Sequence, residues 1–510
     1  MAKRKRDGPN EGDAASGKGA TKRPRPQKPV AAPTLHRISC DQPVAIQIVA
    51  GSYDRVLHGI TAIVKPSSIA SSSSSVKKKK QNKTEETGAP ASKAGDVEFA
   101  DTFLFNAHSS SIRCVALSPP SAPVPGQGQK VLLATGSTDE RINVYNLSAH
   151  PPSLRSTVDQ KVLSSITPRP VLENAGNREL GTLLHHSSNI TRLAFPNRSK
   201  LLSASEDSTV GVTRTRDWAL LHSFKCPVPK LQGRPSGDTA AVGGGPSGVN
   251  DFAVHPSNKI MLSVSRGEHC MRLWNLETGK KARVLNFERH ALAEIGEGRH
   301  STGEARRIIW GSADGEDEFA VGFDRDALVY GMDCRPKCRL MPDTKTKIHE
   351  MCYLQMDGGE TVLAVSTEDG RILFFSTAKE NVKAPTEEKR TLSSATLVAQ
   401  LGGKVAGVSG RIKDFTVLPV EDEDGARSWF IVTAGSDGRV RLWRLGTGDL
   451  RSTGEHGKQV GRLLGTYETQ NRITCLDAFV MIPRPDGAEE SEFEFDDEEE
   501  SEDESDEEGE

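Results

Sequence analysis

Two sets of histidine, serine and aspartate residues are the first candidates for chemistry in this 510-residue chain. They are His108, Ser137 and Asp139, and His186, Ser205 and Asp207. A hydroxyl, an imidazole and a carboxylate hydrogen-bonded in series can carry out nucleophilic catalysis. An active site is singular, however, whereas this set recurs, and buried polar groups need hydrogen-bond partners in any protein. The pattern therefore favours structural roles for these residues, and we predict that the chain is not an enzyme.

A second candidate site consists of Cys334, Cys338, His349 and Cys352, whose spacing is close to that of a zinc site. The spacing is irregular and has no second copy, and Cys352 lies in an alternating run in which a buried thiol suffices. The glycines at 243–248 lack the Gly-Lys-Ser/Thr sequence that cradles phosphate groups. We therefore predict neither a metal nor another cofactor.

Candidate partner-binding residues come from charged positions next to apolar runs. They are Arg411, Lys413, Asp414 and Arg472. An arginine guanidinium suits bidentate contact with a carboxylate or phosphate group. The alternative is ordinary surface charge, since single surface charges contribute little to binding or stability.

The elements that must position these residues are short alternating strands. Residues 433–445 read TAGSDGRVRLWRL, and alternation beside an Asp-Gly turn predicts a β-hairpin. Similar patterns occur at 135–147, 263–276 and 365–376. Their recurrence, with spacings down to about 45 residues, is typical of the four-stranded blades of a β-propeller.

An acid in the hairpin turn marks each repeat, and seven such acids indicate seven blades. They are Asp54, Asp139, Asp207, Glu268, Asp324, Asp369 and Asp437. Residues 44–63 and 472–480 each resemble only half a unit. Their pairing would close the ring without an exposed sheet edge. We predict an all-β, seven-bladed propeller over residues 41–483, with flexible inserts at about 65–98, 148–178, 227–247 and 377–398.

Charge is concentrated outside the predicted propeller. Residues 1–40 are expected to form a disordered basic arm, since residues 1–28 hold nine Lys or Arg against three acids. Lys3, Arg4, Lys5 and Arg6 resemble a nuclear-import signal; the alternatives are a basic arm for nucleic acid and a solvated tail.

The opposite charge is gathered at residues 484–510, expected to form a disordered tail, in which seventeen Asp or Glu follow position 485. Ser491, Ser501 and Ser505 resemble casein-kinase-two phosphorylation sites. Such a tail holds a basic partner such as a ribosomal protein, shields the basic arm, or only aids solubility. The chain has no apolar run long enough for a transmembrane helix, and its scattered cysteines suggest reduced thiols in the cytosol or nucleus.

The repeats resemble WD repeats, with LWN at 273–275 and LWR at 442–444 nearest to the Trp-Asp pair. Five segments together resemble the p21-activated-kinase-interacting protein family, whose fungal member is maintenance-of-killer protein eleven. They are GSYDRVLHG, NAHSSSIRCVALS, HHSSNITRLAF, SGRIKDF and NRITCLDAF. The acidic end departs from the Lys-rich end of the animal relatives.

This resemblance implies a WD40 propeller in which His108 and His186 hydrogen-bond to a turn acid and a strand hydroxyl, with Ser137 and Ser205 as the expected hydroxyls. It also implies a non-catalytic scaffold for biogenesis of the large (60S) ribosomal subunit in the nucleus and nucleolus. The implied partners are pre-60S proteins, including a ribosomal-protein-like assembly factor, with pre-rRNA as a further candidate. The alternative is a negative regulator that binds the regulatory region of p21-activated kinase. A hydrolase that uses one propeller face is a third hypothesis, and no membrane partner is expected.

Overall fold

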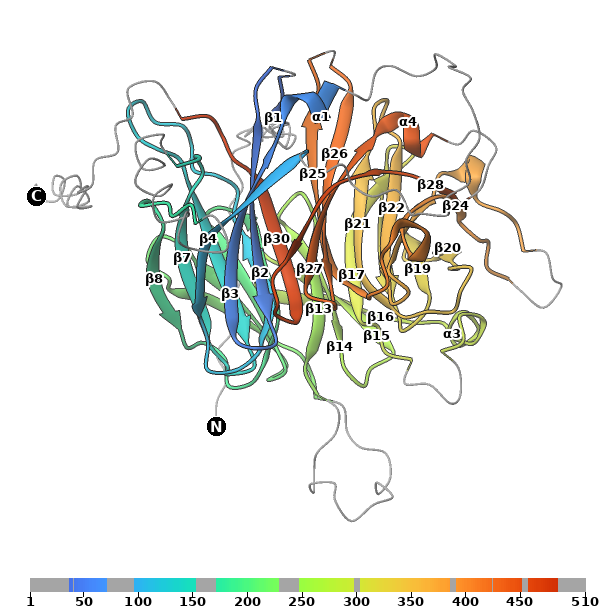
Figure 1. Ribbon diagram of the computed structural model, residues 1–510. Helices are drawn as coiled ribbons and strands as arrows, with labels where there is room; N and C mark the ends of the chain where they lie inside the picture. Colours follow the sequence, from blue (N-terminus) through green and yellow to red (C-terminus); the bar gives the residue numbers. More distant parts are fainter. Residues whose placement is uncertain are drawn as a thin grey trace, which may run out of the picture. The chain divides into compact units, whose positions relative to one another are not determined.

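The structure is a computed structural model. It describes residues 36–39, 41–70, 96–152, 171–228, 247–297, 303–385, 391–423, 425–451 and 457–484. Seven sheets, called blades 1 to 7 here, form an all-β propeller (Figure 1). The innermost strand of each blade lies beside that of the next, and blade 7 returns to blade 1.

The strands of the first four blades are given from the centre of the ring outwards. Blade 1 contains β30 (Ile473–Val480), β2 (Val44–Ser52), β3 (Val56–Val64) and β4 (Val97–Asn106). Blade 2 contains β5 (Ile112–Leu117), β6 (Lys130–Ser137), β7 (Ile142–Ser148) and β8 (Arg178–Leu183). Blade 3 contains β9 (Ile190–Asn197), β10 (Lys200–Ser205), β11 (Thr209–Arg214) and β12 (Leu220–Lys225). Blade 4 contains β13 (Val249–Val254), β14 (Ile260–Ser265), β15 (Cys270–Asn275) and β16 (Lys280–Asn286).

The last three blades follow the same plan. Blade 5 contains β17 (Arg307–Ala313), β18 (Glu316–Gly322), β19 (Ala327–Gly331) and β20 (Pro336–Leu340). Blade 6 contains β21 (Ile348–Gln355), β22 (Thr361–Thr367), β23 (Arg371–Ser376) and β24 (Thr396–Gly402), with β28 (Lys458–Gln459) on its outer edge. Blade 7 contains β25 (Ile412–Glu421), β26 (Arg427–Gly435), β27 (Arg439–Gly446) and β29 (Arg462–Glu468), with β1 (His36–Arg37) beside β25. Short helical turns in the connections are α1 (Pro66–Ala70), α3 (Arg289–Glu294), η1 (Lys379–Asn381), η2 (Lys404–Ala406) and α4 (Thr447–Leu450).

The hairpin between β26 and β27 shows how the sequence produces a blade. Val440 and Leu442 alternate with polar residues and are fully buried. Gly438 in the turn has a φ of 74°, which favours glycine. A Cβ atom there would lie 2.8 Å from the carbonyl oxygen of Asn471 in the neighbouring blade. Glycine therefore allows both the turn and the close approach of two blades.

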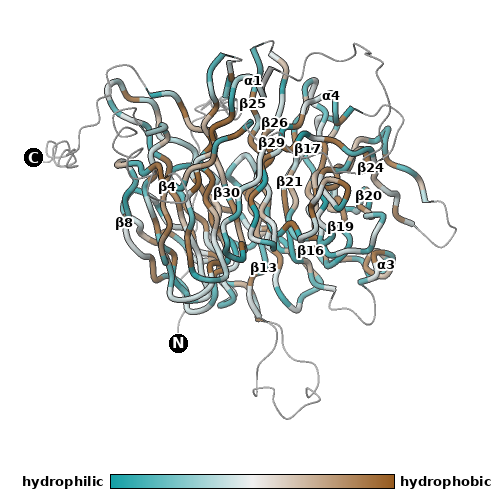
Figure 2. The backbone as a smooth tube through the Cα atoms, viewed as in Figure 1, coloured by the Kyte–Doolittle hydropathy of each residue, from teal (hydrophilic) through white to brown (hydrophobic). Residues whose placement is uncertain are grey.

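The hydrophobic core consists of side chains packed between neighbouring blades. The cluster between blades 1 and 7, for example, contains Ile48, Ile60, Val432 and Leu442, all fully buried. In Figure 2 the hydrophobic residues follow the strands, whereas the turns are largely hydrophilic. Because each blade packs on two others, burial of apolar surface stabilises the ring as a whole.

Blade 1 is assembled from two distant parts of the chain. β30 pairs antiparallel with β2, from Ile46 opposite Val480 to Ser52 opposite Ile473. The two strands lie side by side in Figure 1. The pairing joins the two half-units of the sequence in one sheet, so neither β30 nor β2 is left without a partner strand.

The prediction that residues 1–40 are disordered is wrong near the C-terminal end of this segment. His36 and Arg37 pair parallel with Val420 and Glu421 of β25, and the side chain of Ile38 is only 4% exposed. A two-residue parallel pairing has no periodicity that a sequence pattern could reveal. Residues 1–35 and 40 of the predicted arm, including Lys3, Arg4, Lys5 and Arg6, lie outside the described residues, as do Ser491, Ser501 and Ser505.

The predicted insert at 377–398 is also too long. β24 begins at Thr396, and the backbone at 393–395 pairs with Arg339 of β20. The insert at 65–98 begins with α1 and ends in β4. Among the described residues, no helix is long and apolar enough to cross a membrane.

Candidate functional site at the centre of the ring

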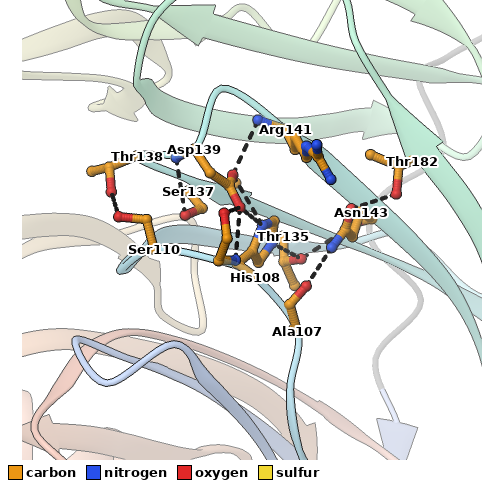
Figure 3. Close-up of polar contacts among 12 residues, drawn as sticks. Ala107, His108, Ser110, Thr135, Ser137, Thr138, Asp139, Arg141, Asn143 and Thr182 are labelled. Atoms are coloured by element: carbon orange, nitrogen blue, oxygen red, sulfur yellow. Dashed lines mark hydrogen bonds and ion pairs between the residues drawn. The ribbon is translucent and has the colours of Figure 1, made fainter.

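The first His/Asp set forms a hydrogen-bonded network at the hairpin turn of blade 2 (Figure 3). The Nδ1–H of His108 donates to the carboxylate of Asp139, at 3.1 Å, and Nε2 accepts from the hydroxyl of Thr135, at 2.8 Å. Asp139 also accepts from the backbone N–H of Ser109. Burial lowers the pKa of His108 despite its carboxylate neighbour, so the imidazole is neutral near pH 7.

Blade 3 repeats this network. His186 contacts Asp207 at 3.0 Å through Nδ1 and Ser203 at 2.7 Å through Nε2. Burial raises the pKa of Asp207, but hydrogen bonds from His186 and Thr209 outweigh it and hold the pKa at about 2. The turn acid is therefore ionised and fully engaged within its own blade.

The expectation that Ser137 and Ser205 are the hydroxyl partners is wrong. The imidazole of each histidine reaches from the turn acid to the strand residue four positions before that acid, which is Thr135 or Ser203. Ser137 and Ser205 instead donate to the backbone oxygens of Ser111 and Ser188. The width of the imidazole and the geometry of the strands decide which hydroxyl the histidine contacts. The spacing of residues in the sequence does not reveal this choice.

Blades that lack the histidine satisfy the turn acid in another way. In blades 4 and 7 an arginine four residues after the acid forms the ion pair: Arg272 with Glu268, and Arg441 with Asp437. The strand hydroxyl then accepts from a tryptophan. The pairs are Trp274 with Ser263, at 2.8 Å, and Trp443 with Thr433, at 3.2 Å. The partner changes between blades, but the acid keeps a donor from its own blade.

The remaining turn acids also have donors. Asp369 pairs with Arg371 at 2.6 Å, and Asp324 with Arg306 at 3.1 Å. Asp54 accepts weakly from the backbone N–H of Arg472, at 3.4 Å.

The hydroxyls in the His/Asp networks are unsuited to attack on a substrate. Thr135 is 0% exposed and Ser203 only 1% exposed. A nucleophile has to come within contact distance of the substrate. These networks therefore act as scaffold, and the candidate functional site lies elsewhere.

Charged side chains from the innermost strands meet at the centre of the ring. We call Arg192, Asp251, Arg307, Glu350, Asp414 and Asp477 the central cluster. Arg192 of blade 3 reaches Glu350 of blade 6 at 2.9 Å and Asp251 of blade 4 at 3.4 Å. Arg307 of blade 5 contacts Glu350 at 3.3 Å. An ion pair thus crosses the ring between blades that do not adjoin one another.

The electrostatics of the central cluster follow from four acids around two arginines. Burial raises the pKa of Glu350, but Arg192 and Arg307 outweigh it, so Glu350 is ionised. Burial, reinforced by the charge of Glu350, raises the pKa of Asp414 to about 7. Burial raises the pKa of Asp477 to about 6. Near pH 7, Asp414 is therefore about half protonated, whereas Asp477 is mostly ionised.

The predicted set of Arg411, Lys413, Asp414 and Arg472 is divided by the structure. Asp414 belongs to the central cluster, because a β-bulge between Ile412 and Asp414 turns its carboxylate inwards. There it accepts from the backbone N–H groups of Phe415 and Leu476, at 2.9 and 2.8 Å. Asp414 is half-buried there, and its predicted contact with a partner stays a prediction.

The three cations of that set remain accessible. Arg411 pairs with Glu368 at 3.0 Å, and Arg472 lies over the Tyr53 ring, 5.5 Å from its centroid. Lys413 is half-buried and has no ion pair with a described residue. Burial lowers its pKa, and the charges of Arg411 and Arg472 lower it further. Lys413 therefore lies within the electrostatic field of the other two cations.

The Cys/His candidates do not form a metal site in the described part of the chain, where no group of three potential ligands is suitably placed. Cys338 and Cys352 are on strands of blades 5 and 6, and burial raises the pKa of each thiol to about 12. Thiols with such pKa values are inert.

Sequence reasoning missed most of the central cluster, although a signal was present. Four members stand two residues after the apolar residue that opens an innermost strand: Arg192, Asp251, Glu350 and Asp414. Blades 1 and 2 have the buried cysteines Cys475 and Cys114 at that position. A charged residue that recurs inside an apolar run is the pattern that could have revealed these four.

The fold and the repeated turn networks define a WD40-repeat propeller. The family model of the WD domain, G-beta repeat, matches residues 100–146 and 177–212. More particularly, the chain is a WD40 protein homologous to MAK11 and to p21-activated-kinase-interacting proteins, at about 25% identity over most of its length.

Three relatives illustrate this homology. Protein MAK11 of Saccharomyces cerevisiae is 27% identical over 395 residues, which cover 74% of each chain. The p21-activated protein kinase-interacting protein 1-like of Danio rerio is 24% identical over 432 residues, which cover 84% of this chain and 80% of the relative. Shk1 kinase-binding protein 15 of Schizosaccharomyces pombe is 23% identical over 385 residues, which cover 74% and 76%.

Proposed function

We propose that the protein is a non-catalytic scaffold for biogenesis of the large (60S) ribosomal subunit. It binds proteins of the pre-60S particle, including a ribosomal-protein-like assembly factor, in the nucleolus. The homology to MAK11 over 74% of both chains carries this proposal, through the ribosome-biogenesis role that the family resemblance implies.

The arrangement of polar residues supports a binding role. The turn acids and buried histidines are engaged within their blades, and the charged residues at the ring centre face one another. Accessible cations remain on the surface, and the sequence adds a basic arm and an acidic end. Such charge separation suits association with nucleic acid and basic proteins in large assemblies.

Depletion of the protein in cells tests this proposal. We expect the tagged chain to co-sediment with pre-60S particles, and depletion to lower large-subunit levels while precursors of its rRNA accumulate. Small-subunit rRNA in the same cells provides the internal control. Normal large-subunit levels after full depletion would contradict the proposal.

A second candidate function is inhibition of a p21-activated kinase by binding its regulatory region. The names of two relatives favour it: one is called a p21-activated protein kinase-interacting protein, and the other a Shk1 kinase-binding protein. This function predicts that depletion raises kinase output and leaves ribosomal subunits unchanged. It also predicts that deletion of Lys3–Arg6 and of residues 486–510 leaves kinase inhibition intact, because a kinase regulator needs neither segment.

A further inference from the structure

The residues that flank the first apolar residue of each innermost strand lie at one end of the ring. Contacts between neighbouring blades place them there. Thr474 of blade 1 donates to the backbone oxygen of Ile112 in blade 2, at 2.6 Å, and Thr191 of blade 3 donates to that of Val249 in blade 4, at 2.7 Å. This end, opposite α1 in Figure 1, also carries the hairpin turns with their acids.

The composition of this end changes around the ring. Blades 6, 7, 1 and 2 contribute what we call the cationic rim: Lys347, Arg411, Lys413, Arg472 and Arg113. At the corresponding positions, blades 3 and 4 have Thr191 and Asn250, whose side chains donate to backbone oxygens of the next blade. The repeat does not require cations at these positions, since two blades do without them.

Three members of the cationic rim have no ion pair with a described residue. They are Arg113, Lys413 and Arg472, from blades 2, 7 and 1. Arg472 rests on the ring of Tyr53, which is 58% exposed. Exposed arginine and tyrosine side chains are frequent energetic centres of protein interfaces. The positive charge of this sector therefore remains available to an anion.

His349 lies between the cationic rim and the central cluster. Its backbone oxygen accepts from Arg307, at 2.9 Å, while its side-chain Nε2 is buried and has no hydrogen-bond partner. Burial and the nearby charge of Lys413 lower the pKa of His349 to about 4, so the imidazole is neutral. A buried polar atom without a partner among the described residues is energetically costly.

We propose that the cationic rim binds an acidic peptide segment of a partner protein, with one carboxylate seated between Lys413 and Arg472. Arg113 and Arg411 lie beside this seat and attract neighbouring acids of the peptide. Tyr53 packs against the peptide backbone at the edge. The proposal concerns the ligand of this surface and goes beyond the cellular process proposed above.

The charges around the rim favour a peptide over RNA. Arg411 is partly neutralised by Glu368, and Lys347 lies 3.6 Å from Asp324. Glu350 and Asp414 lie immediately below His349 and Lys413 in the same strands. A nucleic acid presents a continuous row of phosphates to be neutralised, which would lie close to the carboxylates of Glu368 and Asp324 at the rim. A short peptide can place its few carboxylates mainly on the three unpaired cations, with the partly neutralised Arg411 beside them.

Fluorescence anisotropy of a labelled oligo-glutamate peptide tests the proposal on the full chain. The test variant is Lys413→Glu with Arg472→Glu, for which we expect at least about tenfold weaker binding. The control is Lys200→Glu with Lys259→Glu, which makes the same charge change at exposed lysines of the opposite end. Lys413→Arg with Arg472→Lys keeps the charges and should keep most of the binding.

Three results would overturn the proposal. Equal loss of peptide binding in the test and control variants would show that only net charge matters. Tighter binding of oligo-uridylate, lost in the test variant, would assign the rim to RNA. Peptide binding only after the acids of residues 486–510 are changed to amides would assign the rim to this chain's own tail. Unchanged unfolding midpoints of the variants are required, and none of these results depends on large-subunit levels in cells.

Discussion

The hairpin turns and the innermost strands use polar residues in different ways. At each turn the acid is held by a donor of its own blade, such as His108 on Asp139 or Arg441 on Asp437. At the centre the partners come from other blades: Arg192 and Glu350 belong to blades 3 and 6. A defect at a turn should therefore weaken one blade, whereas a defect at the centre should weaken the closure of the ring.

The largest effect is expected when the ion pair across the ring is broken. Arg192→Met leaves Glu350 and Asp251 without their main counter-charge. We expect a loss of about 3 kcal/mol in the free energy of unfolding, at the low end for a buried pair, because about a third of the arginine side chain is accessible. Urea unfolding measures this loss.

A second substitution shows whether the charge pair itself causes the loss. Arg192→Met combined with Glu350→Gln removes both charges and should recover more than half of it. The single variant Glu350→Gln completes the comparison. If the losses of stability of the two single variants added up to the loss of the double variant, the two residues would act independently. The proposed difference between centre and turns would then be wrong.

The second-largest loss of stability is expected at the hairpin turn of blade 2. His108→Ala leaves the buried hydroxyl of Thr135 and the carboxylate of Asp139 short of one hydrogen bond each. We expect a loss of about 2 kcal/mol. Hydrogen exchange should show the increased opening mainly in β5 to β7, because the network lies within blade 2.

The matched control is His186→Ala, in the same network of blade 3. It should produce a similar loss, with exchange increased in β9 to β11. Equal exchange in all blades for either variant would show that the turn networks also support ring closure.

Sequence patterns predicted the hairpins, because these form between residues that are close in the chain. The Asp-Gly turn before Arg439 and the alternation of Val440 and Leu442 are set by neighbours in the chain, and they form the expected hairpin. Seven turn acids sufficed to count seven blades, because each acid lies in the turn between the second and third strands of its blade.

Non-local features escaped prediction for physical reasons. Whether a histidine reaches Thr135 or Ser137 depends on the width of an imidazole across two strands. Whether Asp414 faces a partner or the ring centre depends on a bulge and on acids from other blades. The cationic rim exists only once blades 6, 7, 1 and 2 are placed side by side.

The smallest expected effect is a dependence of stability on pH that comes from the centre. The pKa of Asp414 is about 7 in the folded chain, raised first by burial and then by Glu350, against an ordinary value of 3.8. Between about pH 4 and pH 7 the folded chain holds this proton and the unfolded chain does not, so stability falls as the pH rises through this range.

The variant Asp414→Asn tests this dependence because it cannot ionise, although its amide disturbs a hydrogen bond from Phe415 or Leu476. We therefore expect the variant to be less stable than the parent at pH 5, and the difference in free energy of unfolding to be about 1 kcal/mol smaller at pH 8. The full pKa shift would give about 2.6 kcal/mol, but Asp414 is only half-buried, so solvent screens part of the effect. Asp139→Asn, at a turn, should show no such narrowing, because the pKa of Asp139 lies below its ordinary value: burial raises it, but His108 outweighs that effect. Urea unfolding of the parent and both variants at the two pH values measures these differences. The comparison would be contradicted if the stability difference from the parent narrowed for Asp139→Asn and not for Asp414→Asn.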